Sequence, residues 1–105
     1  MSNSGQNVKN EALREVAFGD INATYTAVGD PLEHDAFTVS LFNDSDANIY
    51  VSVDGSTDHM KVAAQTGRVF DYKTNDMFRK KETQFYIKYQ TAPTQGAFWI
   101  EVEYT

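Results

Sequence analysis

The side chains in this sequence best suited to chemistry are two histidines, each of which lies beside carboxylates. His34 lies between Glu33 and Asp35, and His59 follows Asp58. An imidazole beside a carboxylate can act as a general base or as a metal ligand. However, the two histidines are not spaced as a metal-binding pair, and no glycine-flanked serine elbow is present. We therefore expect exposed loop histidines, no catalytic residue and no enzyme activity. A small enzyme that uses either histidine is the alternative.

Two polar stretches could supply oxygen ligands or contact loops. The run Asn43-Asp44-Ser45-Asp46 could contribute to a calcium site. It lacks the glycine and the late glutamate of a complete calcium loop, and such residues bond their own backbone in turns, so the pattern favours a turn between two strands. The segment 54–58 contains a glycine suited to a tight hairpin, and this loop could also contact a partner. We expect no metal site and no cofactor.

Six residues are candidate contacts with a partner. Three are aromatic residues that fall on the polar side of alternating segments, namely Tyr50, Tyr86 and Trp99. Outward aromatic side chains are typical of a partner surface or a sugar platform, although a sheet whose outer face is partly covered also carries them. The other three form the only basic run, Arg79-Lys80-Lys81. This run could contact phosphate or an acidic protein surface, or it could be a solvated loop.

Strands are the elements that must position these side chains. Apolar and polar residues alternate with a period of two in five segments, 21–27, 37–41, 49–53, 85–89 and 98–104. Shorter strands are expected at 13–18, 60–63 and 67–72, and a helical turn is expected near 75–80. Turn signals separate the segments. The sequence therefore predicts an all-β fold, a single antiparallel β-sandwich of about eight strands, either jelly-roll-like or Ig-like.

The same alternation predicts the core and the domain boundaries. Because successive strand residues face opposite sides of a sheet, one parity of each segment should be buried. The expected core is Phe18, Phe37, Val39, Leu41, Ile49, Val51, Val53, Val62, Val69, Phe85, Ile87, Phe98, Ile100 and Val102. The polar residues 1–10 are expected to form a flexible N-terminal arm, and residues 11–105 the sandwich domain.

Composition narrows the class of partner. The 105 residues include no cysteine and carry a formal net charge of −6. Two basic and ten acidic residues lie in 1–60, against seven basic and five acidic in 61–105. An acidic chain is a poor candidate for direct nucleic-acid binding, and no apolar run is long enough to suggest a membrane partner. The polar start has no signal-peptide core, so we expect synthesis in the cytoplasm.

Three segments, 42–59, 85–89 and 92–104, resemble the small β-sandwich virion proteins of tailed bacteriophages. Those proteins decorate capsids or complete the joints of the head and tail. Residues 78–83 differ from this pattern, because typical relatives carry proline or glycine in the turn before the later strands. The family has no catalytic residues to transfer.

The resemblance implies a capsid decoration (cement) protein that binds and stabilises the head shell. A head–tail joining or tail component is the alternative within the same class, and a carbohydrate-binding β-sandwich module is the alternative outside it. The implied partners are the major capsid protein or other virion proteins, together with further copies of the chain as a homo-oligomer on the particle. The implied location is the virion, after synthesis in the host cytoplasm.

Overall fold

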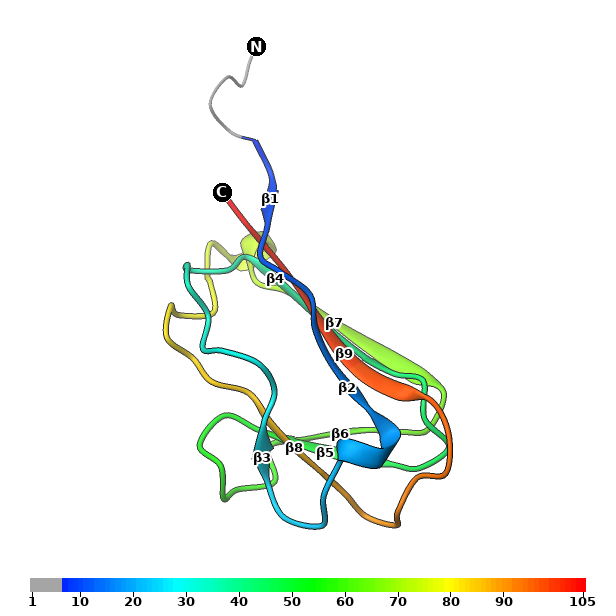
Figure 1. The fold of residues 1–105 in the computed structure, drawn as a ribbon. Helices are drawn as coiled ribbons and strands as arrows, with labels where there is room; N and C mark the ends of the chain where they lie inside the picture. The colour runs from blue at the N-terminus through cyan, green and yellow to red at the C-terminus, as the bar shows by residue number, and fades with distance from the viewer. Residues whose placement is uncertain (1–6) are drawn as a thin grey trace.

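The computed structural model describes residues 7–105 as an all-β chain with two short 3-10 helices. Figure 1 shows the course of the chain. The strands are β1 (Lys9–Asn10), β2 (Arg14–Ala17), β3 (Thr26–Ala27), β4 (Thr38–Asn43), β5 (Ile49–Ser52), β6 (Met60–Val62), β7 (Thr66–Asp71), β8 (Tyr86–Tyr89) and β9 (Ala97–Tyr104). The 3-10 helices are η1 (Phe18–Asp20) and η2 (Lys73–Asn75), so the predicted helical turn lies slightly before 75–80.

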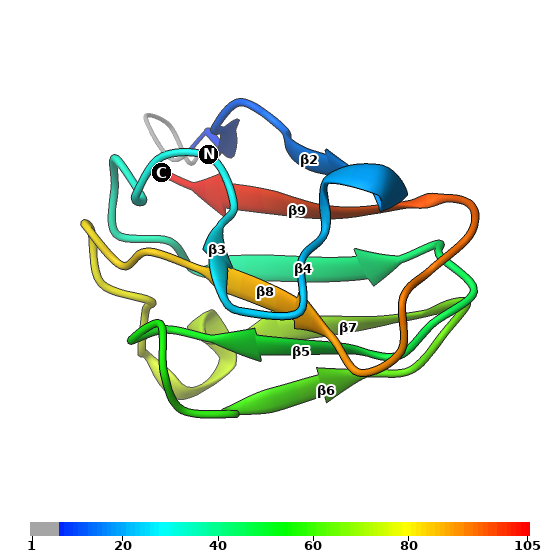
Figure 2. The same ribbon diagram turned by 60° about the horizontal axis from the view of Figure 1, so that its bottom comes forward.

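The strands form two antiparallel sheets, which confirms the predicted β-sandwich. In the five-stranded sheet, β1 and β2 both pair with β9, which pairs with β4, and β4 pairs with β7. In the four-stranded sheet the order is β3-β8-β5-β6. In Figure 1 the strands of the larger sheet run diagonally from the chain ends, and those of the smaller sheet cross below them; Figure 2 shows the same strands from another side.

Most of the predicted core is confirmed. Ten of the predicted residues are buried in one cluster: Val39, Leu41, Ile49, Val51, Val62, Phe85, Ile87, Phe98, Ile100 and Val102. Phe37 and Val53 are only half-buried. The inner faces of two sheets bury their alternate residues against each other, so the parity of β4, β5, β8 and β9 was sufficient to find eight of these side chains. The other two are Val62, on β6, and Phe85, directly before β8.

Two predicted core residues are wrong. Val69 is 62% exposed because it pairs with Ser40 on the outer face, while the adjacent Phe70 pairs with the buried Val39. Phe18 is 40% exposed because it begins η1, where the chain leaves the sheet after β2. At Val69 the local pattern contained apolar neighbours of either parity, and strand pairing decided which one turned inward. At Phe18 the end of β2 decided the outcome.

The strand predicted at 21–27 is largely wrong, and part of the core comes from loops. Only Thr26–Ala27 of the predicted segment 21–27 forms a strand, and its alanines are exposed. Irregular segments instead contribute five buried residues that are outside the predicted core, Ile21, Val28, Leu32, Ala36 and Ala47. Buried loop residues have no fixed period, so hydrophobic periodicity could not find them.

The predicted arm over residues 1–10 falls partly outside the described residues. Residues 1–6 are not described, and the described end of the arm, Lys9–Asn10, is strand β1, which pairs with Tyr104 and Glu103 of β9. These two residues of the predicted arm are therefore paired in the five-stranded sheet.

Candidate interaction surfaces

The structure places the six candidate contact residues in three separate regions. Tyr50 and Tyr86 face outward from the four-stranded sheet, and Trp99 faces outward from the five-stranded sheet on the other side of the core. The basic run 79–81 lies in the loop between η2 and β8. The sequence predicted the outward parity of the aromatic residues correctly, but these residues do not form one surface.

Tyr50 belongs to a row of side chains that crosses the four-stranded sheet. It pairs with Lys61 on β6 and Lys88 on β8. The Lys88 ammonium lies 5.7 Å from the centroid of the Tyr50 ring and 4.8 Å from that of Tyr25. Lys88 forms an ion pair with Asp58 at 3.2 Å, and the Tyr25 hydroxyl donates to the same carboxylate at 2.5 Å. Burial, followed by this hydrogen bond, raises the pKa of Tyr25. Lys88, Asp58 and Tyr25 therefore satisfy one another within the chain.

Tyr86 packs on the hairpin loop that joins β5 to β6. Gly55 has a φ of +84°, and a Cβ at this position would lie 3.4 Å from the Tyr86 ring. The Asp54 carboxylate fixes the loop by accepting the backbone N–H groups of Ser56 and Thr57, each at 2.8 Å. These bonds hold the pKa of Asp54 well below its ordinary value. The predicted hairpin is confirmed, and Tyr86 serves at least partly to cover it.

His59 closes the same loop. Its Nδ1 accepts the backbone N–H of Val53 at 3.1 Å, so the neutral ring carries its proton on Nε2. Nε2 lies 4.0 Å from an Asp54 carboxylate oxygen. His59 therefore helps to hold the turn that its neighbours form.

Trp99 contributes to an aromatic pair on the outer face of the five-stranded sheet. Its ring stacks on Phe42 with centroids 5.6 Å apart, and its indole N–H donates to Glu101 at 3.1 Å. Both rings line a shallow cavity of about 220 Å³ at the end of the sheet, together with residues of the turns after β4 and before β7. Phe42 also covers Gly67, where a Cβ would approach its ring to 2.7 Å.

Asn43 is buried in the turn 43–46, whose side chains were candidates for a calcium site. Its side-chain amide donates to the carbonyl oxygens of Ala47, Val62 and Ala63, at 2.8, 2.9 and 3.2 Å. Its oxygen accepts the N–H and the hydroxyl of Ser45, at 3.0 and 2.6 Å. All its bonding capacity is used to hold two turns together. Within residues 7–105, no group of three or more His, Cys, Asp or Glu is arranged to hold a metal ion.

The backbone of the basic run is held against the segment before β4. Arg79 and Ala36 exchange two backbone hydrogen bonds, at 2.7 and 2.9 Å, and the Lys81 N–H donates to the Asp35 carboxylate at 2.8 Å. The Arg79 guanidinium lies 5.3 Å from the centroid of the Tyr72 ring and donates to its hydroxyl at 3.0 Å. Arg79 is therefore partly engaged within the chain.

Lys80 and Lys81 are exposed, and none of the ion pairs among residues 7–105 includes them. Directly before the run, Met77 and Phe78 are also exposed, by 62% and 56%. We call residues 77–81, which include Arg79, the tip loop. Sequence reasoning missed Met77 and Phe78, although two large apolar residues beside a basic run were a usable signal. An exposed apolar pair next to free cations is typical of a site that contacts a partner.

His34 belongs to a network at the N-terminal side of the sandwich. Its ring stacks on Tyr104 with centroids 3.7 Å apart, and its Nδ1 lies 3.0 Å from a Glu11 carboxylate oxygen. Glu11 also accepts Arg14 at 2.8 Å and the backbone N–H of Glu33 at 3.1 Å. Burial alone would raise the pKa of Glu11, but the hydrogen bonds from Arg14, His34 and Glu33 hold it below its ordinary value of 4.5. Because an ionised carboxylate only accepts, Nδ1 of His34 is the donor.

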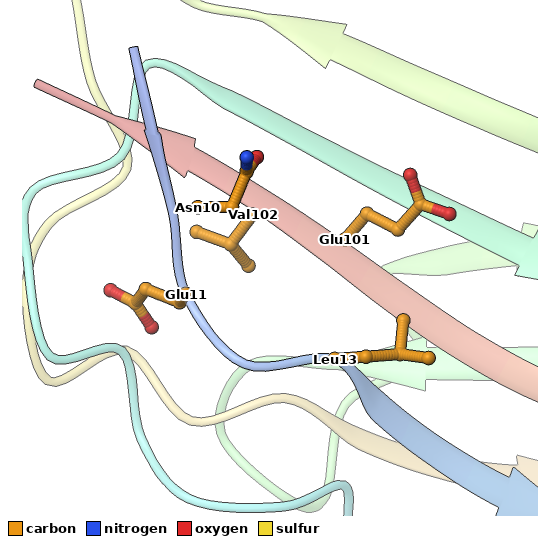
Figure 3. Close-up of a pocket in the computed structure, with 5 residues that line it drawn as sticks. All are labelled: Asn10, Glu11, Leu13, Glu101 and Val102. Carbon is orange, nitrogen blue, oxygen red and sulfur yellow. The ribbon is translucent and has the colours of Figure 1, made fainter. Parts of the chain in front are cut away.

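A β-bulge allows Glu11 and Arg14 to join this network together. Between β1 and β2, the three residues 11–13 lie opposite Glu101 and Val102 alone, so one residue is extra. The Arg14 side chain, which is 6% exposed, continues inward and donates to the Asp30 carbonyl at 2.9 Å. Figure 3 shows the chain bowing away from β9 here, beside a cavity of about 290 Å³. The network ties the chain start to the loop before β4.

No family model matches this chain, and no curated protein matches its sequence. Among solved structures, it is similar to a chain from the work described as "Bacillus endospore appendages form a novel family of disulfide-linked pili". The TM-score is 0.53 at 15% identity, over 100% of this chain and 94% of that one. At this identity the likeness shows a shared fold. This chain has no cysteine, so it cannot form the disulfide links described for those pili.

No helix among residues 7–105 has the length and apolar character needed to cross a membrane.

Proposed function

We propose that this chain is a virion structural protein of a tailed phage that acts as a capsid decoration protein on the head shell. The observation that carries the proposal is the likeness of its fold, over the whole chain, to a protein of endospore pili. Pili, like virions, are structural assemblies. The resemblance of segments 42–59, 85–89 and 92–104 to phage virion proteins supplies the narrower assignment. The chain thus works by contact with the major capsid protein, in the virion.

The tip loop is the surface that best fits such a contact. Phe78 and Met77 can enter an apolar depression on the partner, while Lys80 and Lys81 supply positive charge for an acidic rim. The backbone of this loop is fixed by its hydrogen bonds to Ala36 and Asp35, so little conformational freedom is lost on binding. A small contact is sufficient on a symmetric shell, where many copies bind with avidity.

Counting copies on purified particles tests the assignment. On the order of hundreds of copies would support decoration, and about six or twelve would support a head–tail joint or a tail ring, because each position has its own symmetry. Mass spectrometry and electron microscopy of the particles give this count. Particles that contain no copy of the chain would overturn the virion assignment.

A pair of matched variants tests the tip loop. Phe78 and Leu13 are exposed to nearly the same extent, 56% and 57%, but Leu13 lies in the bulge before β2. Phe78→Ser should weaken binding to particles stripped of the chain by about tenfold or more. Leu13→Ser should leave binding unchanged. Equal binding by both variants would place the contact elsewhere, and Tyr50 and Trp99 would be substituted next.

The aromatic pair on the five-stranded sheet supports a second candidate, a carbohydrate-binding module. Trp99 and Phe42 line a shallow cavity that also has Asp44, Gln65 and Thr66 on its wall. An aromatic face beside polar groups is an arrangement that can bind a sugar ring. A glycan array that detects binding, and loses it on Trp99→Ala, would favour this candidate over virion decoration.

A further inference from the structure

Strand β7 has less protection against strand addition than the other described sheet edges, since its only charged residues are Arg68 and the terminal Asp71. Edge strands present unpaired N–H and C=O groups, and proteins usually blunt them by shortness, lysine, proline or a bulge. The edge strand β3 has two residues, and β6 has three, including Lys61. The edge made by β1 and β2 is broken by the bulge at 11–13.

In contrast, β7 pairs with β4 over six consecutive residues without a bulge, and it contains neither lysine nor proline. Val69, in the middle of the strand, is exposed by 62%. A long, regular edge with an exposed β-branched residue at its centre is a template for another strand. Nothing in the core of the sandwich requires Val69 to be apolar.

We propose that β7 pairs with β7 of a second copy of this chain, antiparallel and about a two-fold axis at Val69. The five-stranded sheets of the two copies then form one continuous sheet. In this register Val69 faces Val69 of the second copy on the outer side, and Gly67 faces Asp71. On the inner side Arg68 faces Phe70 of the second copy. A two-fold interface must be self-complementary in this way.

The residue pattern of β7 favours this register over its neighbours. Residues opposite each other must face the same side of the sheet, so the two nearest alternatives centre the axis on Arg68 or on Phe70. An axis on Phe70 leaves only residues 69–71 of β7 paired and sets Val69 opposite Asp71. An axis on Arg68 sets two guanidinium groups directly opposite each other, which is destabilising. The chosen register instead sets Arg68 against an aromatic ring, a contact that Arg68 already makes with Phe70 of its own chain, 5.0 Å from the centroid.

The charge distribution points to a second copy as the occupant. Although the chain carries a formal net charge of −6, β7 has one basic and one acidic residue, and its neighbour β4 has no charged residue. Two copies can therefore meet at β7 without bringing a net like charge together. This inference rests on the proposed structural role, which it deepens by naming how copies of the chain associate.

Cysteine substitution tests the register, because the chain has no cysteine of its own. Directly opposed Cα atoms in an antiparallel pair lie about 4.5–5.5 Å apart, within the about 4.4–6.8 Å that a disulfide spans. Val69→Cys should form a disulfide-linked dimer under mild oxidation, whereas Arg68→Cys should not. Met77→Cys, exposed to the same extent as Val69 but outside β7, is the control. Cross-linking at residue 68 and not at residue 69 would overturn the register.

Sedimentation velocity on the purified full chain tests the association itself. The unmodified chain should form dimers at concentrations up to about 100 µM, and Val69→Lys, which sets two ammonium groups opposite each other, should raise the dissociation constant about tenfold or more. Met77→Lys should leave it unchanged. A monomer at all concentrations, or a dimer that tolerates Val69→Lys with an unchanged melting temperature, would overturn the inference. Copy counting on particles is independent, so either proposal can fail alone.

Discussion

Asn43→Ala should destabilise the protein more than any other single amide substitution in the described chain. Asn43 is 1% exposed, and its amide satisfies three carbonyl oxygens and the N–H of Ser45. Two of these carbonyls keep other donors, since Ser45 also donates to Ala47 and Thr66 to Ala63. The Val62 carbonyl and the Ser45 N–H therefore lose the most. At about 1–3 kcal/mol for each buried group left unsatisfied, the expected loss is about 3 kcal/mol.

Urea denaturation followed by tryptophan fluorescence measures this loss, since the chain has a single tryptophan. The midpoint should fall while the slope stays constant, because the surface exposed on unfolding does not change. Asn22→Ala is the control: Asn22 makes one exposed side-chain bond, to Thr26 at 3.0 Å, and its loss should cost under about 0.5 kcal/mol. If the two alanine variants are equally stable, Asn43 does not hold the turns in the way described.

Three further predictions concern stability. Ile100→Ala should cost about 2–5 kcal/mol by cavity formation, and Glu101→Ala on the opposite face under about 0.5 kcal/mol; equal thermal melts would contradict the assigned parity of β9. Gly96→Ala should cost more than about 2 kcal/mol by the same denaturation assay, because φ is +90° and a Cβ would overlap the backbone oxygen of Asp44; an unchanged midpoint would contradict this. Glu11→Gln should be less stable than the parent protein at neutral pH, and the difference should shrink as the pH falls below 4.5. A carboxylate with a lowered pKa contributes its stability above its ordinary pKa and loses it as the pH falls through the folded pKa. A difference that does not change with pH would refute this.

The sequence was sufficient for the fold because four strands carry a clear period of two. In β4, β5, β8 and β9 every buried residue except Ser52 lies on the parity that alternation selects, and Ser52 and Asn43 are the instructive cases. Ser52 is buried on the outward parity by the hairpin loop that bonds its hydroxyl. Asn43 is a polar residue on the inward parity of β4. Both are buried by turns, and turn packing depends on contacts distant in sequence, which periodicity does not contain.

For the aromatic candidate contact residues, the sequence predicted that the side chains point outward, but it did not predict where on the surface they lie. Parity showed that Tyr50 and Trp99 point outward, but it could not show that they belong to different sheets, because strand order is set by pairing over long distances in sequence. Met77 and Phe78 were missed for the opposite reason. Apolar residues are expected inside, and only the structure shows that these two lie in a loop that the core does not cover.

The network of Glu11 and Arg14 shows where reading a strand by its period fails in principle. Two side chains three residues apart lie on opposite faces of a regular strand, so the pattern places one of them in solvent. The bulge at 11–13 shifts the phase by one residue, and both charges turn inward as an ion pair with a separation of 2.8 Å. The same bulge interrupts the edge made by β1 and β2, while the opposite edge, β7, stays regular and open. One extra residue therefore brings Glu11 and Arg14 into one network and interrupts the edge made by β1 and β2. In the five-stranded sheet, β7 is then the regular edge at which another strand can add.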